Sequence, residues 1–351
     1  MGNVPNLRFP EFSGEWENCQ IANILSIGSG RDYKHLEKGN IPVFGTGGYM
    51  TSVNECIYDG ETTFIGRKGS INKPFYYNGK FWTVDTLFYT HSFNKTTPKF
   101  VYCLFQTINW LRYNEASGVP SLSKDTIEKI KVFIPQLDEQ RKISEMLSVI
   151  DERIATQNKI IEDLKKLKSA IRKRVFTSLK NEHTESCEIN QLLVYGQPTA
   201  YIVANNEYST DTTLTPVLTA NKGFVLGYTD EDSGIYQKGE CIIFDDFTMD
   251  AKYVSFPFKV KSSAIKILTA KHNVNLRFMF EYLLFLGLKS EEHKRHYISE
   301  IASLVIELPS KEKQNKIANL MTSLDNKLAL EEKAEARYEA KKRYLLSQMF
   351  I

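Results

Sequence analysis

The chain has few of the features that mark secreted, membrane-spanning or metal-dependent proteins. Its five cysteines are scattered over 351 residues, odd in number and never arranged as a C-x-x-C pair, which favours buried, reduced thiols over a disulfide framework or a metal site. No stretch approaches the ~20 apolar residues of a membrane span, and residues 1–16 lack the basic and apolar regions of a secretory signal. These absences predict a cytoplasmic protein without membrane association.

Common catalytic and nucleotide-binding motifs are missing as well. The six histidines never occur in H-E-x-x-H spacing, which gives no support to a zinc hydrolase. The glycine-rich run at 45–48 is not followed by Lys-Ser or Lys-Thr at Walker spacing, and it predicts a turn. A formal net charge of +3 is only mildly basic and does not identify a partner by itself.

The chain does contain an internal repeat. The stretch 135–176 returns without a gap at 309–350, so that Asp151 meets Asp325 and Lys168 meets Lys342. A repeat of such long period indicates two equivalent modules with approximate two-fold symmetry in one chain. The segments ahead of the repeats share an order too, because β-prone runs precede a helical stretch in both. These runs lie at 41–44, 62–65 and 83–89 before a helix at 99–113, and at 216–219, 240–244 and 263–268 before a helix at 276–288.

Both repeated stretches have the apolar spacing of long helices. The apolar residues recur every three or four positions and form one stripe on each helix, namely Ile143, Leu147, Ile150, Ile154, Ile161, Leu164 and Ile171 in the first, and Ile317, Met321, Leu324, Leu328, Tyr338 and Leu345 in the second. About 40 residues at ~1.5 Å each give a rod on the order of 60 Å, which a small domain cannot cover. We therefore expect the two helices to pack on each other in antiparallel orientation.

Polar residues interrupt both stripes, at Gln157, Lys168, Glu331, Glu335 and Lys342. They are open to two interpretations. Either the heptads are imperfect near a crossing or at frayed ends, or these residues fix register and orientation, because a buried polar group left unpaired disfavours slipped alignments.

The expected fold is therefore α+β, with two α/β globular domains separated by two long antiparallel coiled-coil helices and related by pseudo-two-fold symmetry. The predicted boundaries are 1–135 for the first globular domain, 136–180 for the first helix, 181–308 for the second domain and 309–351 for the second helix.

Several stretches resemble the specificity subunits of type I restriction-modification systems. The run Ser-Gly-Val-Pro-Ser-Leu-Ser at 117–123, followed by Ile127, Ile130 and Ile-Pro-Gln-Leu-Asp-Glu-Gln-Arg-Lys-Ile at 134–143, is similar to the boundary between recognition domain and conserved helix in that family. The opening at 5–12, with Gly14 and Trp16, is similar to the start of many members. The second copy departs from the pattern, since 308–314 is looser and Tyr-Ile-Ser at 297–299 replaces the 117–123 run.

The resemblance implies a non-catalytic protein that binds double-stranded DNA. Two target recognition domains would each bind one half of a split, asymmetric site, and the helix pair would act as a ruler between them. It also implies docking of two modification subunits that carry S-adenosylmethionine and methylate adenine, joined by restriction subunits that use ATP and Mg²⁺. This chain has no Asn- or Asp-Pro-Pro-aromatic motif for methyl transfer, so catalysis is expected on partners and no cofactor on this chain.

Three alternatives stay open from the sequence. The same architecture could serve a methylation-only or other defence assembly. The chain could be a coiled-coil adaptor that binds protein alone, although two diversified globular domains argue against it. It could also be a metal-dependent nuclease that uses Asp245, Asp246 and Lys252.

The loop 66–73 is the candidate DNA-reading segment of the first domain. Its glycines permit close backbone approach, and its side chains offer donors suited to base edges and phosphates. The candidates are Arg67, Lys68, Ser70, Asn72 and Lys73, together with the early basic residues Arg31 and Lys34. The alternative is a solvated hairpin loop.

The stretch 245–252 is its counterpart in the second domain. Carboxylates can accept from cytosine, so Asp246 is a candidate base contact beside Thr248 and Lys252, and Lys222 is a candidate phosphate contact. A structural turn is the alternative.

Overall fold

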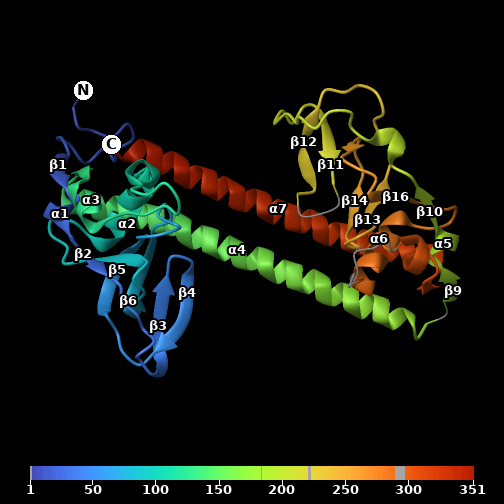
Figure 1. The fold of residues 1–351 in the computed structure, drawn as a ribbon, viewed down its shortest axis with the longest axis horizontal. Coiled ribbons are helices and arrows are strands. Elements are labelled where there is room, and N and C mark those ends of the chain that lie inside the picture. The colour runs from blue at the N-terminus through green and yellow to red at the C-terminus, as the bar shows by residue number, and fades with distance from the viewer. Residues whose placement is uncertain (1, 183, 220–222, 289–296) are drawn as a thin grey trace. The chain divides into compact units, whose positions relative to one another are not determined.

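The computed structural model describes residues 2–182, 184–219, 223–288 and 297–351. The chain forms two compact units, of which unit 1 contains Met1–Lys159 with Glu332–Ile351 and unit 2 contains Ile160–Glu331. Two long helices are divided between the units, α4 (Leu137–Leu179) and α7 (Lys311–Met349) (Figure 1). Each helix contributes one segment to unit 1 and another segment to unit 2. The predicted mixed α and β architecture with long helices is confirmed.

A six-stranded sheet forms the middle of unit 1, in the order β2-β7-β5-β6-β3-β4. Its neighbours pair antiparallel except β3 and β6, which pair parallel. Aromatic and β-branched residues favour these strands, and Phe64, Phe81 and Leu87 are buried between them. The strands are β2 (Ser26–Ser29), β3 (Lys38–Gly45), β4 (Gly48–Val53), β5 (Tyr58–Gly66), β6 (Phe75–Thr83) and β7 (Leu87–His91).

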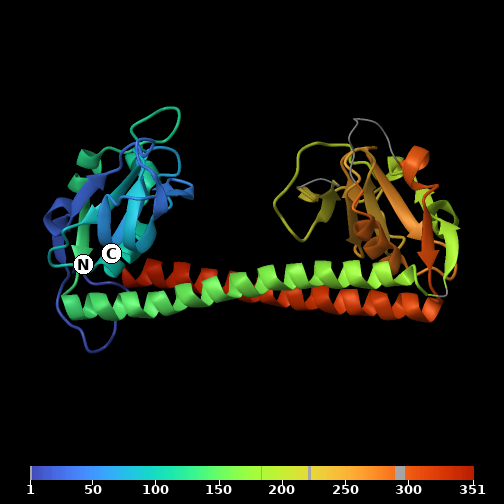
Figure 2. The same cartoon turned by 90° about the horizontal axis from the view of Figure 1, so that it is seen from below.

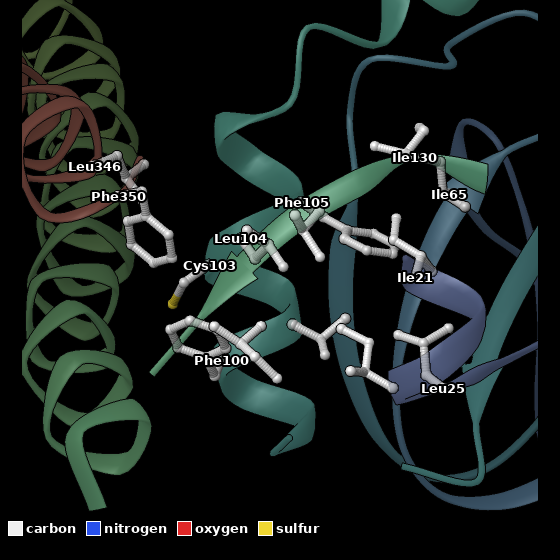
Figure 3. Close-up of a cluster of buried hydrophobic side chains, with 14 of the residues drawn as sticks. Ile21, Leu25, Ile65, Phe100, Cys103, Leu104, Phe105, Ile130, Leu346 and Phe350 are labelled. Carbon is white, nitrogen blue, oxygen red and sulfur yellow. The ribbon is translucent and has the colours of Figure 1, made fainter. Parts of the chain in front are cut away.

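Short elements join this sheet to the helix pair. Helix α2 starts at Pro98, which suits a first helical position, and the Thr97 side chain accepts from the amide of Phe100. Phe100 and Phe105 lie in a core that also contains Leu346 and Phe350 from the end of the chain (Figure 3). The elements are β1 (Glu17–Gln20), α1 (Ile21–Ile24), α2 (Pro98–Thr107), η1 (Trp110–Tyr113), α3 (Lys124–Lys129) and β8 (Lys131–Ile134), with β1 and β8 antiparallel.

Unit 2 repeats this topology with one interruption. Its sheets run β10-β16-β13-β14 and β12-β11-β15, and β11 pairs parallel with β15 as β3 does with β6. The counterpart of β6 is thus split into β14 and β15, and Pro257, which cannot donate to a strand ladder, lies in the break. The strands are β10 (Leu193–Gly196), β11 (Thr215–Leu218), β12 (Val225–Thr229), β13 (Cys241–Asp245), β14 (Ala251–Val254), β15 (Lys259–Val260) and β16 (Ile265–Ala270).

The connecting elements of unit 2 also follow those of unit 1. Helix α6 starts after Asn275, whose side chain accepts from the amide of Phe278. A π-helical turn η3 lies just ahead of β17, where unit 1 has α3 ahead of β8. The elements are β9 (Glu185–Glu188), α5 (Ile189–Leu192), η2 (Thr199–Tyr201), α6 (Leu276–Leu286), η3 (Tyr297–Ile301) and β17 (Val305–Leu308), and β9 pairs antiparallel with β17.

Within each unit, α4 and α7 pack on each other in opposite directions. In unit 1, Ile143 to Ile154 near the start of α4 share a core with Leu345 to Phe350 at the end of α7. In unit 2, Phe176 and Leu179 at the end of α4 share a core with Ile317 and Ala318 near the start of α7. Figure 2 shows the two helices side by side along these segments. No helix in the described part of the chain has the length and apolarity needed to cross a bilayer.

Two local predictions were wrong. The strand expected at 83–89 straddles the turn between β6 and β7, and the expected helix at 99–113 divides into α2 and η1. Hydrophobic runs that cross a tight turn look continuous in sequence, which explains the first error. Asn109 lies outside helical geometry at the start of η1, which separates the two helices in the second case.

Candidate nucleic-acid interface

The loop between β5 and β6 presents the basic candidates of unit 1. Arg67, Lys68, Asn72 and Lys73 are exposed and Ser70 is half-buried, while Ile71 is fully buried and anchors the loop. The conformation depends on glycine at its start, because a Cβ on Gly66 would lie 2.5 Å from the carbonyl oxygen of Ser70. The sequence therefore folds this segment into an anchored loop with outward-pointing donors.

Two further segments border this loop. The amide of Gly69 donates to the carbonyl of Pro120 at 2.8 Å, and Lys68 forms a β-bridge with Ser121. The turn between β3 and β4 lies beside it, since a Cβ on Gly69 would be 3.8 Å from Thr46 Oγ1. We call the surface formed by residues 45–50, 66–73 and 117–121 the unit 1 loop surface.

Arg67 is held by its own neighbours in this surface. Its Nη1 donates to the carbonyl of Asp85 at 3.3 Å, and its guanidinium carbon lies 5.9 Å from the Phe88 ring centroid. These contacts pre-orient a side chain that remains exposed. An exposed, pre-oriented guanidinium suits recognition of guanine or phosphate.

Arg31 and Lys34 lie in the exposed segment between β2 and β3. The amide of Arg31 donates to the carbonyl of Thr83, and its carbonyl accepts from Trp82 Nε1 at 3.0 Å. The turn from Thr83 to Thr86, which contacts both Arg31 and Arg67, therefore links this segment to the unit 1 loop surface.

The counterpart in unit 2 is the turn between β13 and β14, and it corrects the assignment of Asp246. This side chain is 1% exposed and pairs with the buried Lys266, Oδ2 to Nζ 3.4 Å. Its Oδ1 accepts from the amide of Tyr297 at 2.8 Å. A carboxylate enclosed in this way cannot accept from a cytosine without unfolding its surroundings, so its role in this structure is to hold the domain together.

The side chain of Asp245 is engaged in the turn itself. Its Oδ1 accepts from the amides of Phe247 and Thr248 at 2.8 and 3.0 Å, which is a turn-forming contact. Within the described ranges, His, Cys, Asp and Glu side chains form no group of three that could hold a metal ion. The arrangement of Asp245, Asp246 and Lys252 therefore gives the nuclease interpretation no geometric support.

The remaining candidates of unit 2 differ in placement. Thr248 is exposed in the turn, and Lys252 is exposed on β14 opposite Ile243. Lys222 lies outside the described residues.

The predicted stripe residues lie on the covered faces of the long helices. Ile143, Leu147, Ile150, Ile154, Ile161, Ile317, Met321 and Leu345 are buried, and Leu164, Ile171, Leu324, Leu328 and Tyr338 are half-buried. Two of the polar interruptions form ion pairs between the helices: Lys342 Nζ lies 2.5 Å from Asp151 Oδ1, and Lys168 pairs with Asp325. These pairs favour the register interpretation over frayed heptads.

Sequence reasoning missed two groups of residues. Tyr49, Met50 and Val119 expose large apolar side chains on the unit 1 loop surface, and only the adjacent glycines in the sequence indicate a projecting tip. Gln140 and Gln314 are buried where each long helix meets its sheet domain. Their recurrence at equivalent positions of the repeat was the available signal for a shared role.

These features define an internally duplicated protein in which two loop-bearing sheet domains are each anchored on a segment of a long antiparallel helix pair. The family model of the type I restriction modification DNA specificity domain matches residues 13–166 and again 184–340, so the chain belongs to this family. The resemblance stated from the sequence is confirmed.

Relatives agree with this membership, and a solved structure shares the fold. The EcoR124I/EcoR124II specificity subunit of Escherichia coli is 42% identical over 137 residues, which is 37% of this chain and 34% of that protein. The chain thus aligns with about a third of that relative's length. The putative MjaX specificity subunit of Methanocaldococcus jannaschii is 24% identical over 292 residues, covering 72% of this chain and 67% of that protein. The S subunit of the type I restriction-modification system from M. genitalium has a TM-score of 0.71 at 15% identity, covers 99% of both chains and shows the same fold.

Proposed function

We propose that this chain is the DNA sequence-recognition subunit of a type I restriction-modification complex and binds a bipartite, asymmetric DNA site. Each sheet domain reads one half of the site, and the helix pair fixes the separation of the halves. The observation that carries the proposal is the duplication of one loop-bearing domain on a helix pair that belongs to both units.

The chemistry of the unit 1 loop surface supports this function. Arg67, Lys68, Asn72 and Lys73 project from an anchored loop and provide both charged and amide donors. Guanidinium and amide groups can make paired hydrogen bonds to guanine and adenine edges, and lysines neutralise phosphates. Thr248 and Lys252 are exposed at the equivalent place in unit 2.

The partners are proposed on family membership. Two modification subunits, which methylate adenine with S-adenosylmethionine, dock on the helix pair, and restriction subunits with ATP and Mg²⁺ join that core. The complex works in the cytoplasm. This chain itself holds no cofactor and performs no catalysis.

Mapping methylated adenines tests the proposal directly. DNA from cells that express this chain with its modification partner should carry methylation at one asymmetric site with two specific halves and a fixed spacer. Cells that express the modification partner alone are the control. Methylation without a bipartite site, or the same methylation without this chain, would contradict the proposal.

DNA binding at several salt concentrations separates this function from that of a protein-only adaptor. Several phosphate contacts predict a steep fall in the affinity of the purified complex as salt rises. Affinity that is absent at low salt would favour the adaptor. Co-purification without a motor-nuclease subunit would assign the chain to a methylation-only assembly.

A further inference from the structure

The two junctions between sheet domain and helix pair are built on the same plan. In unit 1, Phe350 stacks on Phe100 of α2 at 5.4 Å between ring centroids. In unit 2, Phe176 contacts Phe278 of α6 at the same separation. Both contacts join a domain of one repeat to the long helix of the other, and they fix which positions of α2 and α6 are equivalent.

Buried glutamines confirm these equivalences. Gln140 Oε1 accepts from the amide of Thr97, the residue before α2, and Gln314 Oε1 accepts from the amide of Asn275, the residue before α6. Their Nε2 atoms donate to the carbonyls of Pro135 and Pro309 respectively. Counting from these anchors, Cys103 of α2 is equivalent to Glu281 of α6.

Part of the helix pairing is common to both junctions. The pairs Lys342 with Asp151 and Lys168 with Asp325 exchange the same two positions of the repeat, as a two-fold interface requires. A repeat paired with a second copy of itself would form the same Asp–Lys contacts. These pairs therefore set register but do not select the partner.

A second pair of positions differs completely between the junctions. In unit 2, the fully buried Glu281 receives a hydrogen bond from Arg172 Nε at 2.7 Å and one from Arg277 Nη2 at 2.7 Å. In unit 1 the equivalent positions hold Cys103 and Leu346, which lie in one apolar core (Figure 3). One junction is therefore ionic where the other is apolar.

The two kinds of junction are incompatible if they are exchanged. A first repeat paired with another first repeat would place Arg172 against Cys103, and so would bury a guanidinium without its carboxylate. A second repeat paired with another second repeat would place Glu281 against Leu346 and remove one of its cations. Breaking a buried pair by loss of one partner is strongly unfavourable.

We propose that the Arg172–Glu281 and Cys103–Leu346 pairs make the two repeats select each other and disfavour association of either repeat with a second copy of itself. The partner that each repeat selects is the other repeat. The junction of unit 2 requires an ionic pair, and the junction of unit 1 requires an apolar pair. Both pairs act on the assembly of the two repeats and have no part in DNA binding.

Single substitutions in the full-length chain reproduce each mismatched junction. Leu346→Arg places an arginine against Cys103 in unit 1, as in two first repeats paired with each other. Arg172→Leu places a leucine against Glu281 in unit 2, as in two second repeats paired with each other. Each should lower the melting temperature of its unit by roughly 5–15 °C. The three tryptophans, Trp16, Trp82 and Trp110, all lie in unit 1, so their fluorescence follows that unit. Hydrogen exchange of the α6 amides follows unit 2.

Matched double variants provide the decisive comparison. Cys103→Glu with Leu346→Arg transplants the ionic junction into unit 1, where Lys342 and Lys99 stand at the positions of Lys168 and Arg277. This double variant should recover most of the loss seen in Leu346→Arg. Ser347→Arg adds the same charge at the exposed neighbouring position and should leave the melting temperature nearly unchanged.

The reciprocal double variant in unit 2 provides a second test if the unit 1 double variant does not fold. Glu281→Cys with Arg172→Leu should recover stability relative to Arg172→Leu alone, and Lys173→Leu is the exposed control. If both double variants are no more stable than the sum of their single substitutions predicts, the paired positions are not coupled and the proposal fails.

Discussion

Units 1 and 2 follow one chain path but stabilise it with different chemistry. The interior of unit 1 is aromatic, with Phe44, Phe64 and Phe81 in contact across its sheet. The interior of unit 2 contains the buried ion pair of Lys266 with Asp246, and at its edge the buried Lys259 pairs with the half-buried Glu231. A buried charge that loses its partner is costly. Replacing one residue of a buried ion pair of unit 2 by its apolar counterpart from unit 1 is therefore tolerated only if the partner is replaced as well. Backbone pairing between strands therefore retains the topology of the two units while the side chains of their interiors diverge.

The N-terminal segment adds an asymmetry outside the repeat. Arg8 pairs with the buried Glu139 at 2.7 Å, and the amide of Leu7 donates to the carbonyl of Gln348. The position of Glu139 is taken by Lys313 in the second repeat, which pairs with Glu182 instead. The N-terminal segment therefore contacts both long helices within unit 1. At the equivalent position of unit 2 the long helix carries a cation, Lys313, in place of the anion Glu139.

The largest expected effect comes from the aromatic residues at the two junctions. Phe176→Ala and Phe350→Ala should each destabilise their own unit by about 3–5 kcal/mol, because a large ring packed against other rings leaves a cavity. Urea unfolding followed by tryptophan fluorescence should detect Phe350→Ala strongly and Phe176→Ala weakly. Equal fluorescence shifts for the two variants would show that units 1 and 2 do not unfold separately.

The glutamines at the helix starts should have the next largest effect, and an unequal one. Gln140 makes four hydrogen bonds, to Thr96, Thr97, Lys95 and Pro135, whereas those of Gln314 are to Asn275 and Pro309. Gln140→Ala should cost about 2–3 kcal/mol and Gln314→Ala about 1–2 kcal/mol, since buried groups lose their partners.

Hydrogen exchange at the amides of Thr97 and Asn275 distinguishes a local loss from a global one. Each alanine variant should accelerate exchange at its own amide and leave the other protected. Faster exchange at both amides in either variant would contradict independent junctions.

Much of the helical part of this structure was predictable from the sequence. The bounds of α4 and α7 match the predicted 136–180 and 309–351 closely, because an apolar stripe sustained over many turns is a strong signal. The repeat also predicted equivalent modules, which the common strand order of the two units confirms. Sequence patterns succeed where the same local rule applies over a long distance.

The candidate site was harder to predict, because side-chain placement depends on distant partners. Asp246 and Lys252 look alike in sequence as polar residues near a turn. Asp246 is buried against Lys266 of β16, which is distant in sequence, whereas Lys252 is exposed. Such partners cannot be inferred without the register of β13 against β16. The unit 1 loop was easier, since Gly66 and Gly69 mark its turns directly.

The loop surfaces offer a comparison of function. Arg67→Ala should weaken discrimination in one half-site by roughly 1–3 kcal/mol and leave the other half-site unchanged, because each unit is proposed to read its own half. Competition binding with oligonucleotides altered in each half measures this. Lys252→Ala is the matched change in unit 2. A uniform loss over all sequences after Arg67→Ala would reassign this residue to phosphate contact.

The buried cysteines should produce the smallest effect, seen only in alkali. Burial raises the pKa of Cys103 in unit 1 and of Cys241 in unit 2 to about 12. Below pH ~7.5, about one unit under the ordinary cysteine pKa of about 8.5, both thiols stay protonated in the folded and unfolded chain, so their contribution to stability is complete. Above that pH the unfolded chain releases the protons and the folded chain does not, so the free energy of unfolding should fall by about 1–2 kcal/mol per cysteine by pH 10. Tryptophan-detected unfolding should lose part of this pH slope in Cys103→Ala and keep it in Cys241→Ala, and the opposite assignment would show that the two cores are not separate.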